Sequence, residues 1–339
     1  MRKWNSMVFT KDEDSVAALT DMLYGYQKSR VLLTACELEI FTALGTDVKT
    51  SEEIAVEQNL DNRATDKLMS ALTGMKLLDK TGNRYSNTNL SLRFLVKSKP
   101  DYIGLMDFNV YLWNKWSTLT ESVRKGTAAD LTKIGDMCDH GFESFLEMVN
   151  WRSSILAKSV VDATDFTNIN SVLELGGGTG DYALAFLKAK PDMKCSVFAY
   201  DKVIPYIKEY YKDENVEDKI ELISGDYDID DFGSGYDMIF ISFVAHHNSI
   251  FENIELSRKI HAALNVGGKI VVQDYYISDD RTKPLNNSLF SLETLVNSKS
   301  GDTYTESEMW IILREAKFRH VEKVETEFGT SIISAQKVF

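Results

Sequence analysis

The sequence predicts an α/β protein in which a doubly wound, largely parallel sheet follows a mostly α-helical domain with a winged-helix pattern. Two patterns indicate this fold class. From Ser171 onward, apolar runs of strand length alternate with helical patterns, as in parallel sheets with helical crossovers. Between Thr50 and Tyr85, two short helical patterns precede a hairpin pattern. With 339 residues, of which 44% are hydrophobic, the chain is long enough to form two cores.

The N-terminal domain starts with a long helical pattern. Across residues 15–44, apolar side chains recur at spacings of three and four. Thr50 is a hydroxyl cap with two acids in the turn that follows it, which predicts a short helix from there. A second helix is expected at residues 63–75 and a hairpin at residues 77–85. This order of elements is that of a winged helix.

Many winged helices bind DNA, so the charge of this segment matters. Residues 51–84 carry six acidic and five basic side chains, and the second helix offers only Arg63 and Lys67 to a groove. That is a weak footprint for phosphates. The formal net charge of −13 also argues against nucleic acid or an anionic membrane surface as a partner. We therefore expect the winged helix to serve in packing, as a dimer interface.

Composition restricts the compartment as well. No apolar run reaches about 18 residues, so no membrane span is expected. The N-terminus lacks an apolar core followed by a small-residue cleavage site, so no signal peptide is expected. Cys36, Cys138 and Cys195 lie far apart and form no CxxC pair. They predict a cytoplasmic protein without a zinc site.

The segment at residues 100–164 is predicted to be helical, with a polar, loop-like stretch at 126–141. It is rich in aromatic side chains, most of which are expected in the helical core. A few of them can instead line a pocket for a flat organic substrate. The candidates for such a lining, each of which could equally belong to the core, are Trp113, Phe145, Met148 and, further along the chain, Phe290.

Five strands are predicted in the second half, at Ser171–Leu175, 195–200, Ile220–Ser224, 238–243 and 269–274. Residues 265–268 are expected to form a turn before the fifth strand, and residues 284–300 a loop. A helix at 306–316 and two short strands should complete the domain. Because helical crossovers place the carboxyl ends of parallel strands on one rim, the loops after these strands are expected to meet.

The loop after the first of these strands is the most informative part of the chain. Residues 171–175 form an apolar strand that carries Glu174, and four glycines follow within five positions. Such a turn lets a ligand lie against bare backbone, and a merely structural turn would not need so many glycines. A dinucleotide fingerprint would require glycine where Asp181 stands, and the ending of a Walker loop is absent. The remaining pattern is that of S-adenosylmethionine (SAM) binding, with candidate cofactor residues Glu174, Gly176, Gly177 and Gly178.

Two further loops of the rim are candidates for the cofactor site. The end of the second strand should offer an acceptor to the ribose hydroxyls. After the third strand, Gly225 is followed by Asp226, which can accept from the adenine amine, and by Tyr227, which can cover the ring. Asp226 as an ordinary turn residue is the alternative, because Gly-Asp is common in turns.

Adjacent histidines follow the fourth strand. His246 and His247 lie beside the predicted cofactor site, where an imidazole can act as a general base. On an extended segment neighbouring side chains point to opposite faces, so only one of the two should face the pocket. No metal site is expected, because adjacent histidines rarely converge on one ion and no Cys, Asp or Glu stands at ligand spacing.

The chain resembles the small-molecule O-methyltransferases of the plant caffeate and animal hydroxyindole type, which include bacterial antibiotic-tailoring enzymes. The resemblance covers nearly the whole chain and is carried by the first helix, the winged helix and segments 113–116, 176–180, 225–226 and 246–264. It implies a class I SAM-methyltransferase Rossmann-like sheet at residues 101–339, with a helical substrate-pocket segment at 101–165. It also implies a homodimer formed through residues 1–100, SAM as cofactor, and a hydroxyl of a small aromatic metabolite as the methyl acceptor.

The resemblance assigns roles to single residues. An ungapped count back from residues 263–264 places the family's catalytic histidine on His246, which takes the proton of the substrate hydroxyl while that oxygen attacks the methyl group in line. Of the two acids that flank this histidine in plant members, the first aligns with Asp274 and the second with Thr303. The family's lysine near the methionine end of the cofactor aligns with Ser242.

The ribose-binding acid of the family is displaced in this chain. Aligned without gaps it falls on Ala199, and Asp201, which has the same side-chain parity, is expected to replace it. These departures leave two rival functions open. One is a SAM-binding relative that catalyses a non-methyl reaction such as hydroxylation or decarboxylation, and the other is a winged-helix regulator that senses a small ligand.

Overall fold

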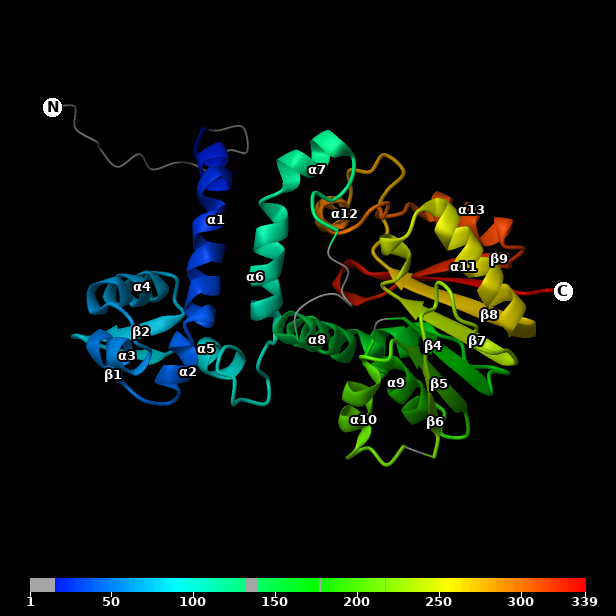
Figure 1. Ribbon diagram of the computed structural model, residues 1–339, viewed down its shortest axis with the longest axis horizontal. Helices are drawn as coiled ribbons and strands as arrows, with labels where there is room; N and C mark the ends of the chain where they lie inside the picture. Colours follow the sequence, from blue (N-terminus) through cyan, green and yellow to red (C-terminus); the bar gives the residue numbers. More distant parts are fainter. Residues whose placement is uncertain (1–15, 132–138, 177, 217) are drawn as a thin grey trace. The chain divides into compact units, whose positions relative to one another are not determined.

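The computed structural model describes residues 16–131, 139–176, 178–216 and 218–339. The chain divides into two compact units, Met1–Val110 and Tyr111–Phe339 (Figure 1). Part of the polar stretch expected at 126–141 falls outside the described residues. Within the described ranges, no helix has the length and apolar character needed to cross a bilayer.

The first unit is a small helical domain with a three-stranded sheet of order β1-β3-β2. Thr50 caps α3 as predicted, since its side chain accepts from the Glu53 amide at 3.1 Å and the Glu53 carboxylate accepts from the Thr50 amide at 2.6 Å. The succession of α3, α4 and the β2–β3 hairpin confirms the winged-helix prediction. The elements are α1 (Val16–Glu37), α2 (Ile40–Leu44), β1 (Lys49–Thr50), α3 (Ser51–Glu57), α4 (Asn62–Gly74), β2 (Leu78–Thr81), β3 (Arg84–Asn87) and α5 (Asn89–Phe94).

Helix α6 (Leu105–Trp116) crosses the boundary between the units, and the second unit is an α/β domain. Its elements are α7 (Leu119–Lys125), α8 (Asp139–Ala163), β4 (Ser171–Leu175), α9 (Asp181–Ala189), β5 (Lys194–Ala199), α10 (Ile204–Tyr211), β6 (Ile220–Ser224), β7 (Tyr236–Ser242), η2 (Ala245–His247), α11 (Ile250–Ala263), β8 (Leu264–Asp274), α12 (Leu285–Asn297), α13 (Glu306–Glu315), β9 (Arg319–Glu325), η3 (Glu327–Gly329) and β10 (Ser331–Gln336).

These strands form a seven-stranded sheet of order β6-β5-β4-β7-β8-β10-β9. Strands β4 to β8 pair in parallel, and β10 and β9 add an antiparallel edge. β4 pairs with both β5 and β7, so the strand order reverses there. In doubly wound sheets a ligand binds outside the carboxyl ends of the strands at such a reversal.

Helices cover both faces of the sheet (Figure 1). Alternate residues of a strand point to opposite faces, so Leu173 and Leu175 join the core that includes α11 and α13. On the other face, the Phe240 ring packs against Tyr182 and Phe186 of α9, with ring centroids 4.7 and 5.2 Å apart. The sheet is therefore buried on both sides, which explains why its central strands are almost wholly apolar.

Two predictions about this unit were wrong. Residues 284–300 were expected to form a loop, but α12 occupies most of them. The polar residues at its start resemble a loop in sequence. In the structure, however, the Asn287 side chain is buried and donates to the Tyr276 carbonyl at 2.8 Å. Residues 265–268 were expected to form a turn, but they belong to β8. There the Gly267 amide donates to the Lys337 carbonyl at 2.7 Å, and the pairing with β7 shifts register.

Candidate active site

The carboxyl ends of the parallel strands bring four loops of the second unit and the last residue of β8 to one rim, as the sequence predicted. The loop at 176–180 follows β4, and the loops at 200–201 and 225–227 follow β5 and β6. The loop at 243–247 follows β7, and Asp274 ends β8. The predicted cofactor and catalytic residues that the structure describes therefore belong to this rim.

The glycine turn is required by packing as well as by backbone conformation. At Gly180, where φ is 80°, a Cβ atom would lie 2.0 Å from the Tyr211 hydroxyl, which donates to the Gly180 carbonyl at 2.6 Å. At Gly178 a Cβ atom would lie 2.8 Å from the Glu174 carboxylate. Gly176 has a φ of 130°, and its Cβ would lie 2.6 Å from Val244 in the histidine loop. Gly177 lies outside the described residues, and cofactor contact by the other glycines stays a prediction.

Glu174 lies beneath this turn and is buried. Its carboxylate accepts a hydrogen bond of 2.7 Å from the Ala183 amide in the first turn of α9. Burial raises the pKa of Glu174 to about 8, although the Ala183 bond acts in the opposite direction. The side chain thus ties β4 to the helix that follows the turn, and its direct contact with the cofactor stays a prediction.

The raised pKa of Glu174 predicts a loss of stability with rising pH. Since the folded-state pKa of about 8 exceeds the ordinary value of 4.5, the folded chain holds a proton that the unfolded chain releases. This contribution is fully present below the ordinary value and is lost, at about 1.4 kcal/mol per pH unit, as the pH rises toward the folded-state pKa. A Glu174→Gln variant keeps an acceptor for the Ala183 amide and has no proton to lose. In thermal unfolding without cofactor, the stability of the variant relative to that of the wild type should therefore increase between about pH 5 and about pH 8. Stability profiles that stay parallel over this range would contradict the prediction.

The two loops predicted to hold the ribose and the adenine differ in what they offer. Ala199 ends β5, is buried and has only a methyl group, whereas Asp201 is exposed in the turn beyond it. After β6, the Asp226 carboxylate accepts from the Asp228 amide at 2.9 Å, as in an ordinary Asx turn, which is the alternative considered for this residue. Tyr227 packs against Tyr200, a residue that sequence reasoning missed, with ring centroids 5.8 Å apart.

Behind the second of these loops, Gly225 leaves no room for a side chain. A Cβ atom there would lie 2.6 Å from the Phe198 ring at the end of β5. This contact explains why glycine precedes the predicted adenine-binding pair. Direct contacts of residues 225–227 and of Asp201 with a cofactor stay predictions.

His246 is buried and held by Asp274. Its Nδ1 atom lies 3.0 and 3.1 Å from the two carboxylate oxygens, and its backbone amide donates to the same carboxylate at 3.2 Å. The Tyr275 amide also donates to Asp274, at 2.9 Å. A carboxylate at Nδ1 favours the tautomer with the proton on that nitrogen, which leaves Nε2 unprotonated and able to accept.

The histidine pair does not lie on an extended segment, contrary to expectation. Residues 245–247 form the 3₁₀ turn η2, so the rings of His246 and His247 lie close together, with centroids 4.1 Å apart. His247 is exposed to solvent on part of its surface. Desolvation by nearby protein atoms, and after it the charges of His246 and Arg152, lower the pKa of His247 well below its ordinary value.

Aromatic rings enclose the histidine. The Phe290 ring of α12 lies 4.9 Å from the His246 ring and 4.6 Å from the Tyr275 ring. Phe243 lies 5.3 Å from Tyr275, and the Arg152 guanidinium of α8 lies 3.6 Å from the Phe243 ring centre. Phe290 was predicted, whereas Arg152, Phe243 and Tyr275 were missed. The positive φ of Phe243, at 55°, is the kind of backbone strain often found at functional sites.

The other predicted pocket residues lie on helices of this unit. Phe145 and Met148 are half-buried on α8, seven and four residues before Arg152, a spacing that places all three on one face of the helix. Trp113 is half-buried on α6. The roles of these three side chains in a pocket stay predictions.

Two positions where the family carries charge are neutral here. The Ser242 hydroxyl donates to the Gln273 side chain at 3.0 Å. Thr303, at the position of the second acid, is fully buried, and its hydroxyl has no hydrogen-bond partner among the described residues. The neighbouring Asp302 is instead paired with Arg281 at 3.0 Å. Asp274 is thus the acid that holds His246.

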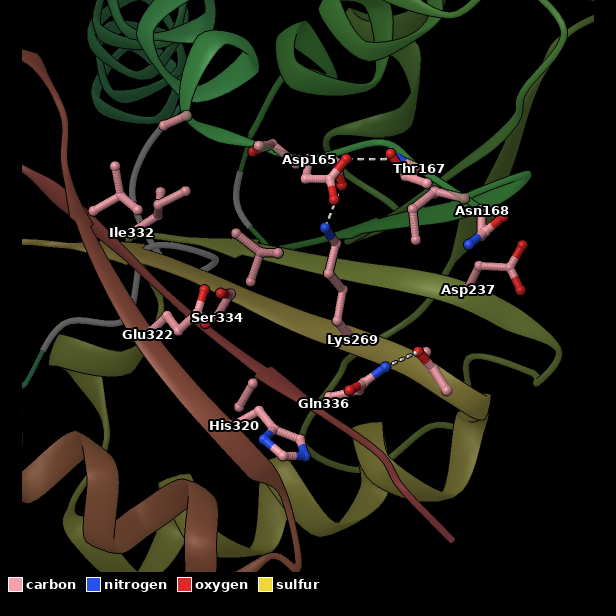
Figure 2. Close-up of a pocket in the computed structure, with 18 of the residues that line it drawn as sticks. Asp165, Thr167, Asn168, Asp237, Lys269, His320, Glu322, Ile332, Ser334 and Gln336 are labelled. Atoms are coloured by element: carbon pink, nitrogen blue, oxygen red, sulfur yellow. Dashed lines mark hydrogen bonds between the residues drawn. The ribbon is translucent and has the colours of Figure 1, made fainter.

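A hollow of about 590 Å³ lies elsewhere on the second unit (Figure 2). It is lined by Asp165 and Thr167 before β4, by Asp237 near the start of β7, and by Lys269 of β8. Lys269 donates to the Asp165 carbonyl across it. These residues belong to the amino ends of the parallel strands, opposite the rim where such sheets bind ligands. We do not assign the cofactor to this hollow.

Comparisons with known proteins identify the family of the chain. A family model described as an O-methyltransferase domain matches residues 116–319, and one described as an O-methyltransferase dimerisation domain matches residues 20–97. The tetracenomycin polyketide synthesis 8-O-methyl transferase TcmO of Streptomyces glaucescens is 29% identical, over 90% of this chain and 91% of its own. Acetylserotonin O-methyltransferase of Gallus gallus is 27% identical, over 92% of this chain and 95% of its own.

Solved structures show the same fold. PigF with SAH superposes with a TM-score of 0.88 at 20% identity, over 95% of this chain and 100% of its own. Human N-acetylserotonin methyltransferase in complex with SAM gives a TM-score of 0.84 at 24% identity, over 98% of this chain and 100% of its own. The domain matches together span most of the sequence, and the first alone spans more than half. The chain belongs to the O-methyltransferase family, and its activity is SAM-dependent O-methylation.

Proposed function

We propose that the protein methylates a hydroxyl of a small aromatic metabolite, with His246 as the general base. The observation that carries this proposal is the clamp between His246 and Asp274, with Nδ1 3.0 Å from the nearer carboxylate oxygen. It lies next to the glycine turn, because Val244, two residues before His246, packs against Gly176. The base and the predicted cofactor turn are therefore parts of one site.

The residues of the rim suit the cofactor. Side chains at Gly178 and Gly180 would fill the turn, and bare backbone there can approach a ligand closely. Asp201 and Asp226 offer carboxylate acceptors beyond β5 and β6. Arg152 is the positive charge beside Phe243, and we propose that it replaces the lysine that the family carries at Ser242. When bound, the cofactor supplies an electrophilic methyl group on a positively charged sulfur.

His246 has two tasks in this reaction. A phenol has a pKa near 10, so at neutral pH it needs a base within hydrogen-bond reach, which is worth roughly 10² to 10⁴ in rate. Nε2 of His246 takes the proton, and Asp274 stabilises the imidazolium that results. The rings of Phe290, Tyr275 and Phe243 favour a flat substrate, and they would restrict how its hydroxyl can be oriented when the cofactor is bound.

Calorimetric titration of SAM and S-adenosylhomocysteine tests the cofactor site. We expect Asp201→Ala and Asp226→Ala each to weaken binding by about 10-fold or more, because each removes a charged acceptor for a ribose hydroxyl or the adenine amine. Asp192→Ala, an exposed acid in the turn before β5, is the matched control and should bind as the wild type does. Loss in Asp226→Ala alone would show that Asp201 does not hold the ribose. Binding that is unchanged in both variants would refute the assignment of the cofactor to these two acids.

A turnover assay that measures S-adenosylhomocysteine and product together distinguishes the rival chemistry. Methyl transfer releases one S-adenosylhomocysteine for each product, whereas hydroxylation or decarboxylation by a SAM-binding relative would not. Stoichiometric S-adenosylhomocysteine formation from a phenol therefore supports the proposal. Product formed without it would support the alternative.

We also propose that the protein is a homodimer formed through its first unit. The matched dimerisation domain supports this, and so does α1, whose Leu19, Met22 and Leu23 are all exposed. Contiguous exposed apolar side chains on one helix are typical of an interface. Light scattering should give the mass of two chains, and a monomer at micromolar concentration would contradict the proposal.

A further inference from the structure

An acidic side chain lies in the wall of the proposed substrate site, where neither the family resemblance nor the sequence pattern placed one. Glu293 follows Phe290 by three residues on α12, so the two share one face of the helix. That face is turned toward His246, because the Phe290 ring lies 4.9 Å from the His246 ring. Glu293 is half-buried, and its carboxyl group is hydrogen-bonded to the Trp116 side chain of α6.

The surroundings of Glu293 disfavour the ionised form of its carboxyl group. Burial raises its pKa, and the Trp116 bond, His246 and Arg152 act in the opposite direction. An indole has a single N–H to donate, whereas a carboxylate can accept several hydrogen bonds. Among the described residues, Trp116 is the side chain that hydrogen-bonds to this carboxyl group. Glu293 therefore has acceptor capacity left in a site lined by rings, and a half-buried carboxyl group in such surroundings gains from a further partner.

A bound substrate can be that partner. We propose that Glu293 is a specificity-determining residue, which selects aromatic substrates that carry a second O–H or N–H donor in addition to the hydroxyl that His246 deprotonates. Among the described residues no ion pair joins Glu293 to His246, whose ring is paired with Asp274, so the two groups that would hold the substrate are not in direct contact. The second donor therefore belongs at a position not adjacent to the reacting hydroxyl, as in a resorcinol-type ring and unlike a catechol. This inference rests on the proposed function and names its substrate class.

The competing explanation is that Glu293 only braces α12 against α6 through Trp116. Replacement by glutamine separates the two. A Glu293→Gln side chain can still accept from the Trp116 N–H through its amide oxygen, and it then presents an N–H₂ donor to the substrate. A bracing role predicts little change in substrate preference. A selecting role predicts that the preference reverses, from a substrate that donates to one that accepts.

The experiment measures kcat/KM from S-adenosylhomocysteine formation at saturating SAM, with resorcinol, its monomethyl ether and catechol as probes. The wild type should prefer resorcinol to the ether by about 10- to 100-fold. Glu293→Ala should abolish that preference, and Glu293→Gln should favour the ether. Catechol should respond to neither substitution by more than about threefold. Glu255→Gln, an exposed glutamate of α11, is the matched control and should behave as the wild type does.

The outcomes are distinguishable. If phenols are methylated but both Glu293 variants keep the wild-type ranking, this inference is wrong and the proposed function stands. If no phenol yields S-adenosylhomocysteine although SAM binds, the proposed function fails and this inference fails with it. Circular dichroism shows whether Glu293→Ala folds. If it does not, the substrate preference of the near-isosteric Glu293→Gln alone tests the inference: a reversed preference supports it and an unchanged one refutes it.

Discussion

Replacing His246 with alanine is expected to lower kcat by roughly 10² to 10⁴-fold, the range typical of losing a general base. The side chain is buried, its Nδ1 is occupied by Asp274, and the Nε2 that remains is the atom able to take a proton from the substrate. Since the imidazole does not belong to the glycine turn or to the loops at 201 and 226, SAM affinity should stay within about threefold of the wild type. Single-turnover methylation and calorimetry measure the two quantities separately.

His320 offers a matched control for this substitution. It lies on β9, away from the rim, is exposed and has a φ of 53°, a conformation that asparagine tolerates. His320→Asn should therefore leave kcat and SAM affinity unchanged. A His246→Ala enzyme with near-normal kcat would show that another group accepts the proton. The adjacent His247, whose low pKa keeps it neutral and able to accept, would then be the next candidate.

Much of the fold could be predicted because local and global preferences agree. β4 and β6 begin and end where the apolar runs at Ser171–Leu175 and Ile220–Ser224 do. β4 is buried on both faces and is apolar apart from Ser171 and Glu174, and the glycine turn gives it a sharp end, whereas β6 is an edge strand with the exposed Glu221. α12 escaped prediction because its first turn is polar, and Asn287 there is a buried hydrogen-bond donor to Tyr276 and not a loop residue.

The site was predictable only where it follows the strands. His246, Asp274 and the glycines stand directly after β7, at the end of β8 and after β4, so topology alone brings them together. Arg152 and Glu293 lie on α8 and α12, and nothing in their local sequence distinguishes them from the charged side chains of a solvated helix face. Only the packing of these helices against the rim turns them toward Phe243 and His246.

The single orienting acid leads to the second large effect. Asp274→Asn is expected to lower kcat by roughly 10²-fold or more while leaving SAM affinity close to that of the wild type. Asp274 accepts from the His246 amide at 3.2 Å, from the Tyr275 amide at 2.9 Å and from the His246 ring at 3.0 Å. A neutral amide has one acceptor oxygen for these three donors, and its N–H₂ group facing Nδ1 favours the tautomer with the proton on Nε2, where the substrate proton must go. Thr303 has replaced the second acid, so no other carboxylate at that position compensates.

A double-mutant cycle tests whether His246 and Asp274 act as one unit. If Asp274 works only by holding the imidazole in its tautomer and stabilising its charge, it contributes nothing once the imidazole is gone. The His246→Ala/Asp274→Asn enzyme should then be no slower than His246→Ala alone, within about threefold. Strictly additive losses would mean that Asp274 touches the substrate or cofactor directly. In that case Asp274 itself would be a catalytic group, and the clamp seen between the two side chains would not explain its effect.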